Sequence, residues 1–382
     1  MSRRATITLM TAVLLTAAAC AGDAGTTTTT QAEAPTTAPP GTTAPPDTET
    51  TTTSPVELRD VTLALSTISP FSYGYQNAKA LGFYEEEGLN VELQATGGSS
   101  DIAQILATGT AEAGMASPGA PLSAIEAGAK LYPFYTYAFG SVFDIRVPVD
   151  SDIQTVEDLE GLSVGISELA GGEVPLARFL LINAGLDPDT DVNLLAVGTD
   201  APLVQLAFDR GDIQAYVGGR TDLAAIEATG VELRSIFPEG LQELPSDGLL
   251  ASQEASDDRD LLIGLGRATA KGQLVGYTNF DATVCILKEQ IPESFTDEET
   301  GRASLEGALP QTTAPQDAEG NYLFGEVDVE DWNANVQIFL AGGTIETEID
   351  MGPLVIDDLF EEINDFDQAA VIELANNLPT DC

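Results

Sequence analysis

Glycine and serine residues gather in short loops between strand-like and helix-like runs, and these loops hold the residue types best suited to binding. One such loop lies in the stretch ATGGSSDIAQILATGTAEAGMAS, residues 95–117. The first turn of a helix offers free backbone N–H groups and the positive end of the helix dipole. A phosphate or another anion could bind there, and so could any ligand with a hydrogen-bond acceptor. The residue types alone leave both interpretations open.

The sequence contains no histidine, and this absence limits the chemistry that the loops can perform. It removes the commonest general base, the serine–histidine and cysteine–histidine nucleophile pairs, and every histidine-based metal site. We therefore expect no catalytic residues, no metal and no cofactor. The 15 Lys and Arg residues against 61 Asp and Glu residues give a formal net charge of −46. Such a charge repels nucleic acids and anionic membrane surfaces, so neither is an expected partner.

The N-terminal region has the pattern of an export signal followed by a tether. A basic start, MSRR, precedes the apolar run ATITLMTAVLLTAAA, which is short for a bilayer span and ends at Cys20. Small residues before a cysteine resemble the bacterial lipoprotein signal, although Ala17 stands where that pattern usually has leucine. We expect a signal peptide over residues 1–19, a lipid on Cys20 and a Thr/Pro-rich linker over residues 20–55. Simple secretion with an incidental cysteine is the alternative to this extracytoplasmic, membrane-anchored location.

Two further cysteines, Cys285 and Cys382, follow far along the chain. An even number of remaining cysteines in an exported protein predicts a disulfide between them. Two separate, unpaired cysteines are the alternative.

From about residue 58, strand-like and helix-like runs alternate. Strands are expected at VTLALS, LNVELQAT, AEAGMAS and KLYPFYTYAF, with helices between them, and this rhythm predicts a mainly parallel sheet flanked by helices. A second unit of the same kind begins near residue 150, and the run SDGLLASQEA at 246–255 predicts a strand that returns to the first unit. Helices are expected over residues 257–276, 280–291, 296–309, 328–341 and 353–376. Two crossings between two such units make a hinge, and a hinge makes a ligand cleft.

Several segments resemble one family of binding proteins. NAKALGFYEEEGLNVEL at 77–93, GSSDIAQILATGTAEAGMAS at 98–117 and VPVDSDIQTVEDLEGLSVGI at 147–166 are similar to extracytoplasmic substrate-binding proteins of ABC importers. The nitrate, sulfonate and taurine type, which includes binders of the thiamine pyrimidine precursor, matches best. The resemblance covers roughly residues 58–276.

The resemblance implies an α/β, two-lobed fold of the periplasmic-binding-protein type (type II). Residues 56–146 and 245–382 would form the first lobe, and residues 147–244 the second. Such a protein, expected here as a monomer, closes on a small-molecule solute and delivers it to an ABC permease with its ATPase. The same resemblance has an enzyme branch, the synthases of the thiamine pyrimidine. Their chemistry needs histidine and iron, so we expect no enzyme here.

In open sheets of this kind, ligands bind outside the carboxyl ends of the strands. The candidate ligand-binding residues of the first lobe are Ser66, Thr67, Phe71, Tyr73, Gly97, Gly98, Ser99, Ser117, Pro118, Tyr135 and Tyr137. Those of the second lobe are Ser167, Gly171, Gly172, Glu173, Thr199, Asp200, Gly219 and Arg220. Turn formation or helix capping is the alternative role for each loop residue, and a place in the core is the alternative for the two strand tyrosines.

The charge of the ligand is predicted from Glu173. Sulfonate and nitrate binders of the family commonly carry small hydroxyl residues at this place, whereas a carboxylate at a helix start repels an anion. Arg220 is the one strongly placed cation of the predicted cleft loops. We therefore expect a neutral or cationic organic solute, such as a thiamine-type pyrimidine or an amine. A taurine, alkanesulfonate or nitrate binder, a ligand-sensing lipoprotein and an adhesive lipoprotein with a degenerate cleft remain alternatives.

Overall fold

The computed structural model describes residues 58–66, 68–169, 171–238 and 247–382. The predicted signal peptide, the predicted lipidation site Cys20, the whole predicted linker and the candidate Thr67 lie outside these residues. Within them, no helix combines the length and the apolar character that a membrane crossing requires.

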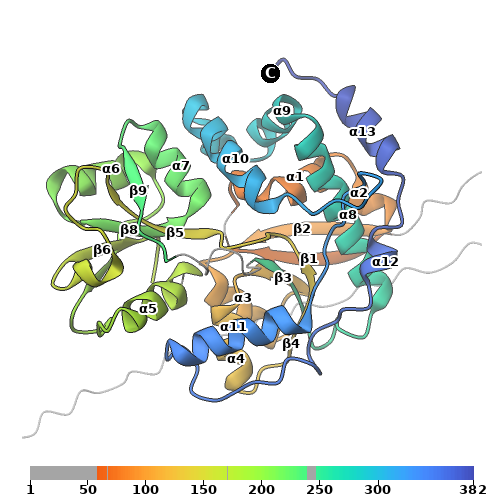
Figure 1. The fold of residues 1–382 in the computed structure, drawn as a ribbon. Coiled ribbons are helices and arrows are strands. Elements are labelled where there is room, and N and C mark those ends of the chain that lie inside the picture. The colour runs from red at the N-terminus through yellow and green to blue at the C-terminus, as the bar shows by residue number, and fades with distance from the viewer. Residues whose placement is uncertain (1–57, 67, 170, 239–246) are drawn as a thin grey trace, which may run out of the picture. The chain divides into compact units, whose positions relative to one another are not determined.

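The first sheet contains the strands that the sequence predicted for the first lobe. It is built from β1 (Arg59–Leu65), β2 (Leu89–Ala95), β3 (Ala113–Ala116), β4 (Leu131–Thr136) and β10 (Gly248–Ser252). The strand order is β2-β1-β3-β10-β4, in which β1 runs parallel to β2 and β3 while β10 runs antiparallel to both of its neighbours (Figure 1). The strand that returns from the second lobe therefore inserts near one edge of this sheet.

The second sheet repeats this arrangement. It is built from β5 (Phe143–Pro148), β6 (Ser163–Ile166), β7 (Asn193–Ala196), β8 (Ala215–Gly219) and β9 (Leu233–Ser235). The order is β7-β6-β8-β5-β9, and β5 is antiparallel to β8 and β9. Two mainly parallel sheets, each with one reversed strand and flanking helices, confirm the predicted α/β fold class.

The boundary predicted between the lobes falls inside a strand. β5 pairs with the second sheet from Phe143 onward, so residues 143–146 lie with the second lobe and not with the first. β5 was not predicted as a strand because the two charged residues Asp144 and Arg146 lie within it. These two side chains form an ion pair with an Nε–Oδ2 distance of 3.0 Å, and Arg146 also contacts Glu227 at 2.6 Å. The chain therefore first crosses between the sheets at residues 137–142.

Helices cover the faces of both sheets, as Figure 1 shows. In the first lobe they are α1 (Tyr73–Ala80), α2 (Phe83–Glu86), α3 (Ser99–Ala107), α4 (Gly119–Glu126) and α8 (Arg259–Thr278). In the second lobe they are α5 (Glu173–Asn183), α6 (Ala201–Arg210) and α7 (Arg220–Ala228). α1 and α8 cross so closely that a Cβ atom at Gly272 would lie 1.9 Å from the carbonyl oxygen of Gly74.

The C-terminal region contacts the helices of both lobes. It contains α9 (Phe280–Gln290), α10 (Glu298–Thr312), α11 (Val329–Ala341), α12 (Phe360–Ile363) and α13 (Gln368–Asn376). The last two replace the single helix predicted over residues 353–376, because Asp367 caps a new helix by accepting from the N–H of Ala370 at 3.0 Å. α10 reaches the second lobe, where Ser304 Oγ donates to the carbonyl of Thr221 in α7 at 3.3 Å.

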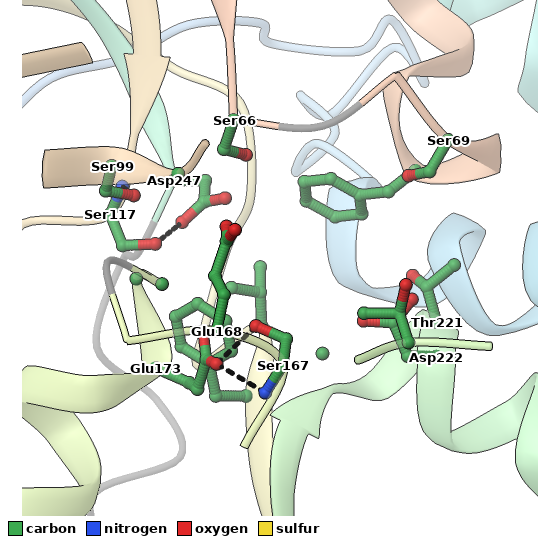
Figure 2. A pocket seen from close by; sticks show the side chains of 18 residues that line it. Ser66, Ser69, Ser99, Ser117, Ser167, Glu168, Glu173, Thr221, Asp222 and Asp247 are labelled. Atoms are coloured by element: carbon green, nitrogen blue, oxygen red, sulfur yellow. Dashed lines mark hydrogen bonds between the residues drawn. The ribbon is translucent and has the colours of Figure 1, made fainter. Parts of the chain in front are cut away.

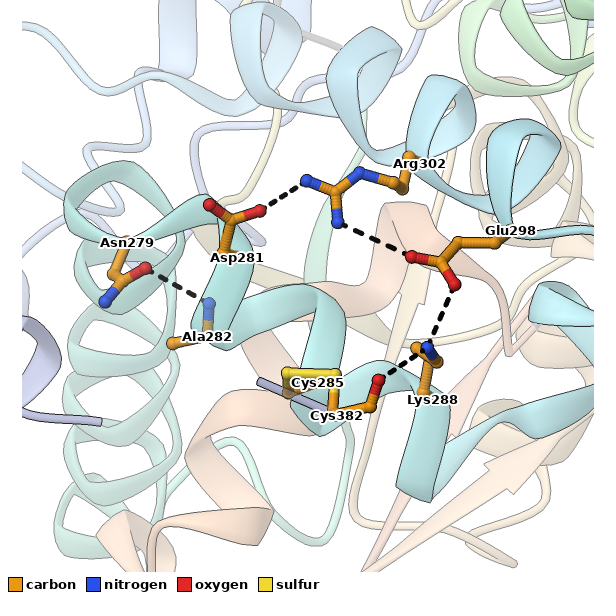
Figure 3. The surroundings of a disulfide bond; sticks show 8 residues. All are labelled: Asn279, Asp281, Ala282, Cys285, Lys288, Glu298, Arg302 and Cys382. Atoms are coloured by element: carbon orange, nitrogen blue, oxygen red, sulfur yellow. Dashed lines mark hydrogen bonds and ion pairs between the residues drawn. A yellow bond between two sulfur atoms is a disulfide. The ribbon is translucent and has the colours of Figure 1, made fainter. Parts of the chain in front are cut away.

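A disulfide attaches the C-terminus to α9 (Figure 3). It joins Cys285 to Cys382, whose Cα atoms are 5.6 Å apart. Lys288 Nζ donates to the carbonyl of Cys382 at 3.2 Å and lies 3.1 Å from Glu298 Oε2 in α10. Arg302 in turn forms an ion pair with Asp281. The covalent bond and these ion pairs hold α9, α10 and the last residue together.

Candidate functional site

A pocket lies between the two sheets, where the loops that follow their strands face each other. It encloses about 610 Å³, with the open solvent at its mouth included. Figure 2 shows it from close by. The described residues that line it are Ser66, Ser69, Phe71, Gly98, Ser99, Ser117, Val142, Phe143, Ser167, Glu168, Gly171, Gly172, Glu173, Thr199, Gly219, Thr221, Asp222 and Asp247.

The structure brings many of the sequence-predicted residues together at this pocket. Those that line it are Ser66, Phe71, Gly98, Ser99, Ser117, Ser167, Gly171, Gly172, Glu173, Thr199 and Gly219. The two lobes meet closely here, since a Cβ atom at Gly172 would lie 2.7 Å from both Ser99 Oγ and Ser117 Oγ.

The three tyrosines of the prediction lie in the core and not at the pocket. Tyr73, Tyr135 and Tyr137 are each at most 1% exposed. Their hydroxyl groups bond within the protein: Tyr135 donates to Gln273 Oε1 at 2.6 Å, and Tyr137 donates to the carbonyl of Phe71 at 2.8 Å. Burial raises the pKa of all three phenols above the usual range. Tyr135 and Tyr137 therefore serve packing, which was the alternative role for these two, and Tyr73 is buried at the start of α1.

Four other predicted residues also lie off the pocket lining. Arg220 begins α7 and donates its backbone N–H to the carbonyl of Val142 at 2.8 Å, while its buried Nε finds no hydrogen-bond partner among the described residues. Asp200 caps α6 by accepting from the N–H of Leu203 at 3.1 Å. Gly97 and Pro118 flank residues that do line the pocket. The cation expected in the cleft is therefore not one of its lining groups.

The prediction missed several residues that line the pocket: Ser69, Val142, Phe143, Glu168, Thr221, Asp222 and Asp247. Glu168 directly follows a predicted residue, Ser167, and Thr221 and Asp222 directly follow Arg220, so their positions in the loops were a usable signal. Asp247 is different, because it directly precedes β10 and lies in the run SDGLLASQEA, which was predicted as a strand and not as a loop.

Glu173 is held in the pocket wall by Ser167, which lies earlier in the same loop. It is 3% exposed, and its Oε1 accepts from the backbone N–H of Ser167 at 2.9 Å and from the Ser167 hydroxyl (Figure 2). A Cβ atom at Gly171 would lie 2.3 Å from Glu173 Oε2, so the loop can fold over this carboxylate because residue 171 is glycine. The predicted negative charge at the start of α5 is thus part of the pocket.

Asp222 brings a second carboxylate from the second lobe. It is the third residue of α7, and it lies beside Gly219, whose N–H favours its charged form. Burial, and then the negative charge of Glu173, raise the pKa of Asp222 to about 7. The carboxyl group therefore changes its charge near neutral pH when the pocket is empty.

Asp247 brings a carboxylate at the hinge. It is 5% exposed, and it accepts a hydrogen bond from Ser117 Oγ (Figure 2). Its carbonyl oxygen accepts from the N–H groups of Tyr137 and Ala138, both at 2.9 Å, so it links the first crossing to the second. Burial raises the pKa of Asp247 to about 6, against the lowering effect of the serine hydroxyl.

Glu168 completes the set of acidic residues. Its side chain projects into the pocket in Figure 2. Burial, together with the charges of Glu173 and Asp101, raises its pKa. All four lining carboxyl groups thus lie near other acids or in poorly solvated positions, and none of the described lining residues is lysine or arginine. Among the described residues, no three acidic or cysteine side chains form a group that could hold a metal ion.

Comparisons with known proteins place the chain in a family. The family model described as "NMT1/THI5 like" matches residues 70–279. A comparison with curated proteins finds no match.

Solved structures share the fold at low sequence identity. The alkanesulfonate-binding protein SsuA from Xanthomonas axonopodis pv. citri, bound to MOPS, has a TM-score of 0.60 at 18% identity over 78% of this chain and 99% of that chain. The periplasmic nitrate-binding protein NrtA from Synechocystis PCC 6803 has a TM-score of 0.60 at 13% identity, over 85% and 92%. The ligand-binding component of an ABC-type import system from Staphylococcus aureus, with zinc bound, has a TM-score of 0.59 at 11% identity, over 80% and 99%. The likenesses show a periplasmic-binding-protein fold, and the family match covers more than half of the chain: this protein is a member of the NMT1/THI5-like family.

Proposed function

We propose that this protein is the substrate-binding component of an ABC importer, and that it captures a small organic cation between its two lobes and delivers it to a permease. The family, the fold and the printed functions of the structural neighbours support the transport role. Cys20 lies in a lipoprotein-like signal, so we also propose that a lipid on this residue keeps the protein at the outer face of the cell membrane.

The single observation that favours a cationic ligand is the acidic lining of the pocket. Four carboxyl groups line it, from Glu168, Glu173, Asp222 and Asp247, and none of the described lining residues is lysine or arginine. The internal residues outside the described ranges, 67, 170 and 239–246, contain no lysine or arginine either. A buried carboxylate is costly unless a positive charge or several hydrogen bonds compensate it. A cationic solute supplies this compensation.

The helix N-termini at the pocket support the same choice. α3, α5 and α7 all begin there, and a helix N-terminus attracts anions. Each of these helices, however, carries its own carboxylate in the first turn: Asp101, Glu173 and Asp222. The positive ends of these helix dipoles are thus already compensated by acidic side chains of the protein. This arrangement disfavours the sulfonate and nitrate ligands named for the structural neighbours.

The rest of the lining suits a small solute with an apolar part. Serine hydroxyls from Ser66, Ser69 and Ser99 can donate or accept hydrogen bonds, while Phe71 and Phe143 add apolar surface. An aliphatic amine combines these features and is charged at neutral pH. A thiamine-type aminopyrimidine combines them too, and becomes a cation when its ring nitrogen takes up a proton.

Calorimetric titration tests the proposal directly. An alkylamine and the aminopyrimidine should bind, whereas taurine, an alkanesulfonate and nitrate should not bind at millimolar concentration. The Glu173→Gln variant should weaken the binding of cations. Tight taurine or nitrate binding that this substitution leaves unchanged would refute the charge argument. Uptake of the bound solute by vesicles that hold the permease would separate transport from a sensor role.

A further inference from the structure

We propose that the solute carries two separated positive charges, as a linear diamine or polyamine does, with one ammonium group bound at Asp247 and the other at Asp222. This inference rests on the proposed function, because it names the class of cation that the same pocket takes.

The two carboxylates are held apart by the fold. Asp247 belongs to the hinge, where its carbonyl oxygen bonds to the first crossing of the chain. Asp222 belongs to the first turn of α7 in the second lobe. Figure 2 shows their side chains at opposite sides of the pocket, with Glu168 projecting into the space between them in this view. One ammonium group is therefore badly placed to serve both.

Among the residues that the structure describes, each of the two carboxylates has only part of its hydrogen-bonding capacity satisfied. From these residues Asp247, which is 5% exposed, accepts one side-chain hydrogen bond, donated by Ser117 Oγ. Asp222 faces the carboxylate of Glu173 and has the N–H of Gly219 as its favourable partner. An ionised carboxylate can accept about four hydrogen bonds. Both groups therefore retain acceptor capacity that an ammonium group with three donors can use.

Ionising both acids in the empty pocket is unfavourable in free energy, and their raised pKa values indicate this. Burial raises that of Asp247 to about 6 and that of Asp222 to about 7. A solute with one charge compensates one of them and leaves the other poorly solvated. A solute with two charges compensates both, which is why we infer a dication. Glu173, by contrast, already receives two hydrogen bonds from Ser167.

The shape of the cleft also fits an elongated solute. A second hollow shares Ser69, Thr199 and Asp222 with the first, so the cleft continues beyond the Asp222 end. Acidic side chains line this continuation as well, from Asp200, Glu293 and Asp297. A polyamine longer than the first pocket can extend along this path.

The test compares linear diamines, from diaminopropane to diaminooctane, with alkylamines of the same carbon number by calorimetry at about pH 8. The best diamine should bind about 100-fold more tightly than its matched alkylamine, because it makes one further charge-assisted contact. Asp247→Asn and Asp222→Asn should each bring the diamine to within a few-fold of the alkylamine. Asp209→Asn makes the same charge change on an exposed part of α6 and should leave both affinities unchanged.

The outcomes separate this inference from the proposed function. If alkylamines and diamines bind equally, or if both pocket variants keep the diamine preference, the pocket is a cation site but the two-charge inference is wrong. A calcium or zinc ion that binds more tightly than every diamine would also overturn it. If no amine binds while taurine or nitrate does, the proposed function fails as well. If either variant does not fold, the comparison of diamines with alkylamines on the unaltered protein still tests whether a second positive charge increases the affinity.

Discussion

The affinity for a cationic solute should depend steeply on pH, because the carboxyl groups that bind it take up protons near neutrality. Asp222 has a pKa of about 7 and Asp247 a pKa of about 6 in the empty pocket. Protonation removes the negative charge, so a raised carboxyl pKa means that binding weakens as the pH falls through 7 and 6. An alkylammonium group keeps its own charge throughout this range, since its pKa lies near 10.

The size of this effect follows from the two pKa values. If only the doubly ionised site binds, that form makes up about 0.9 of the protein at pH 8 and about 0.001 at pH 5. The apparent affinity should therefore fall about 1,000-fold between these two pH values. The Asp222→Asn variant, left with the Asp247 titration alone, should show a fall of about 10-fold, and Asp247→Asn a fall of about 90-fold.

Calorimetry of one diamine at a series of pH values, with ionic strength held constant, measures these profiles. Other acids face the same groups: Glu173 lies near Asp222, and Glu168 adds a further raised pKa at the pocket. They can add to the fall at acid pH, but they cannot reverse its sign. A flat profile between pH 5 and 8, or an affinity that increases on acidification, would refute the assignment of these carboxylates to the cation site.

Three further predictions concern steric fit, stability and the disulfide. Gly172→Ala should weaken solute binding at least about 10-fold in calorimetry, because its Cβ atom would lie 2.7 Å from Ser117 Oγ and hold the lobes apart. Asp222→Asn should raise the free energy of unfolding of the empty protein at pH 8 by about 2–4 kcal/mol, measured with urea, because it removes a poorly solvated charge. Replacing both Cys285 and Cys382 by serine should lower that free energy by about 2–4 kcal/mol, because the bond closes a loop across a sequence separation of 97.

Each of these predictions has its own control. Gly352→Ala adds the same methyl group away from the pocket and should leave binding unchanged, so equal losses in both glycine variants would contradict the steric argument. The gain from Asp222→Asn should vanish by about pH 4, because a raised carboxyl pKa costs stability only once the pH exceeds the unfolded value. A gain that persists at that pH would point to another cause. The cysteine prediction fails if the serine variant unfolds at the same urea concentration as the unaltered protein.

Much of the fold could be predicted from local patterns in the sequence. Alternation of strand-like and helix-like runs indicated both sheets and the returning strand β10, because β-branched and aliphatic runs bounded by glycine-bearing turns are local signals. β5 was not predicted, because it carries the charged residues Asp144 and Arg146. In the structure, Arg146 forms ion pairs with both Asp144 and Glu227. Charged residues within a strand look like a loop in the sequence, and only the tertiary structure brings their partners to them.

For the candidate pocket, the sequence likewise predicted the positions of the loops but not the directions of all side chains. The loop at Gly98 and Ser99 and the loop from Ser167 to Glu173 were expected at strand ends, because that position follows from the order of elements. Tyr135 and Tyr137 were expected there too, but the direction of a strand side chain depends on which face of the sheet other helices cover. α8 covers that face, and Gln273 in α8 accepts the hydrogen bond of Tyr135.

The sequence was sufficient to predict a hinged two-sheet body and a carboxylate at the start of α5, because periodicity and helix starts are properties of neighbouring residues. The convergence of Asp222 and Asp247 on one pocket is a different kind of property. Asp222 lies in the second lobe and Asp247 at the hinge, and both line one cleft only because the chain crosses twice between the sheets. Their raised pKa values, and with them the preference for a cation, arise from burial that only the packed lobes create.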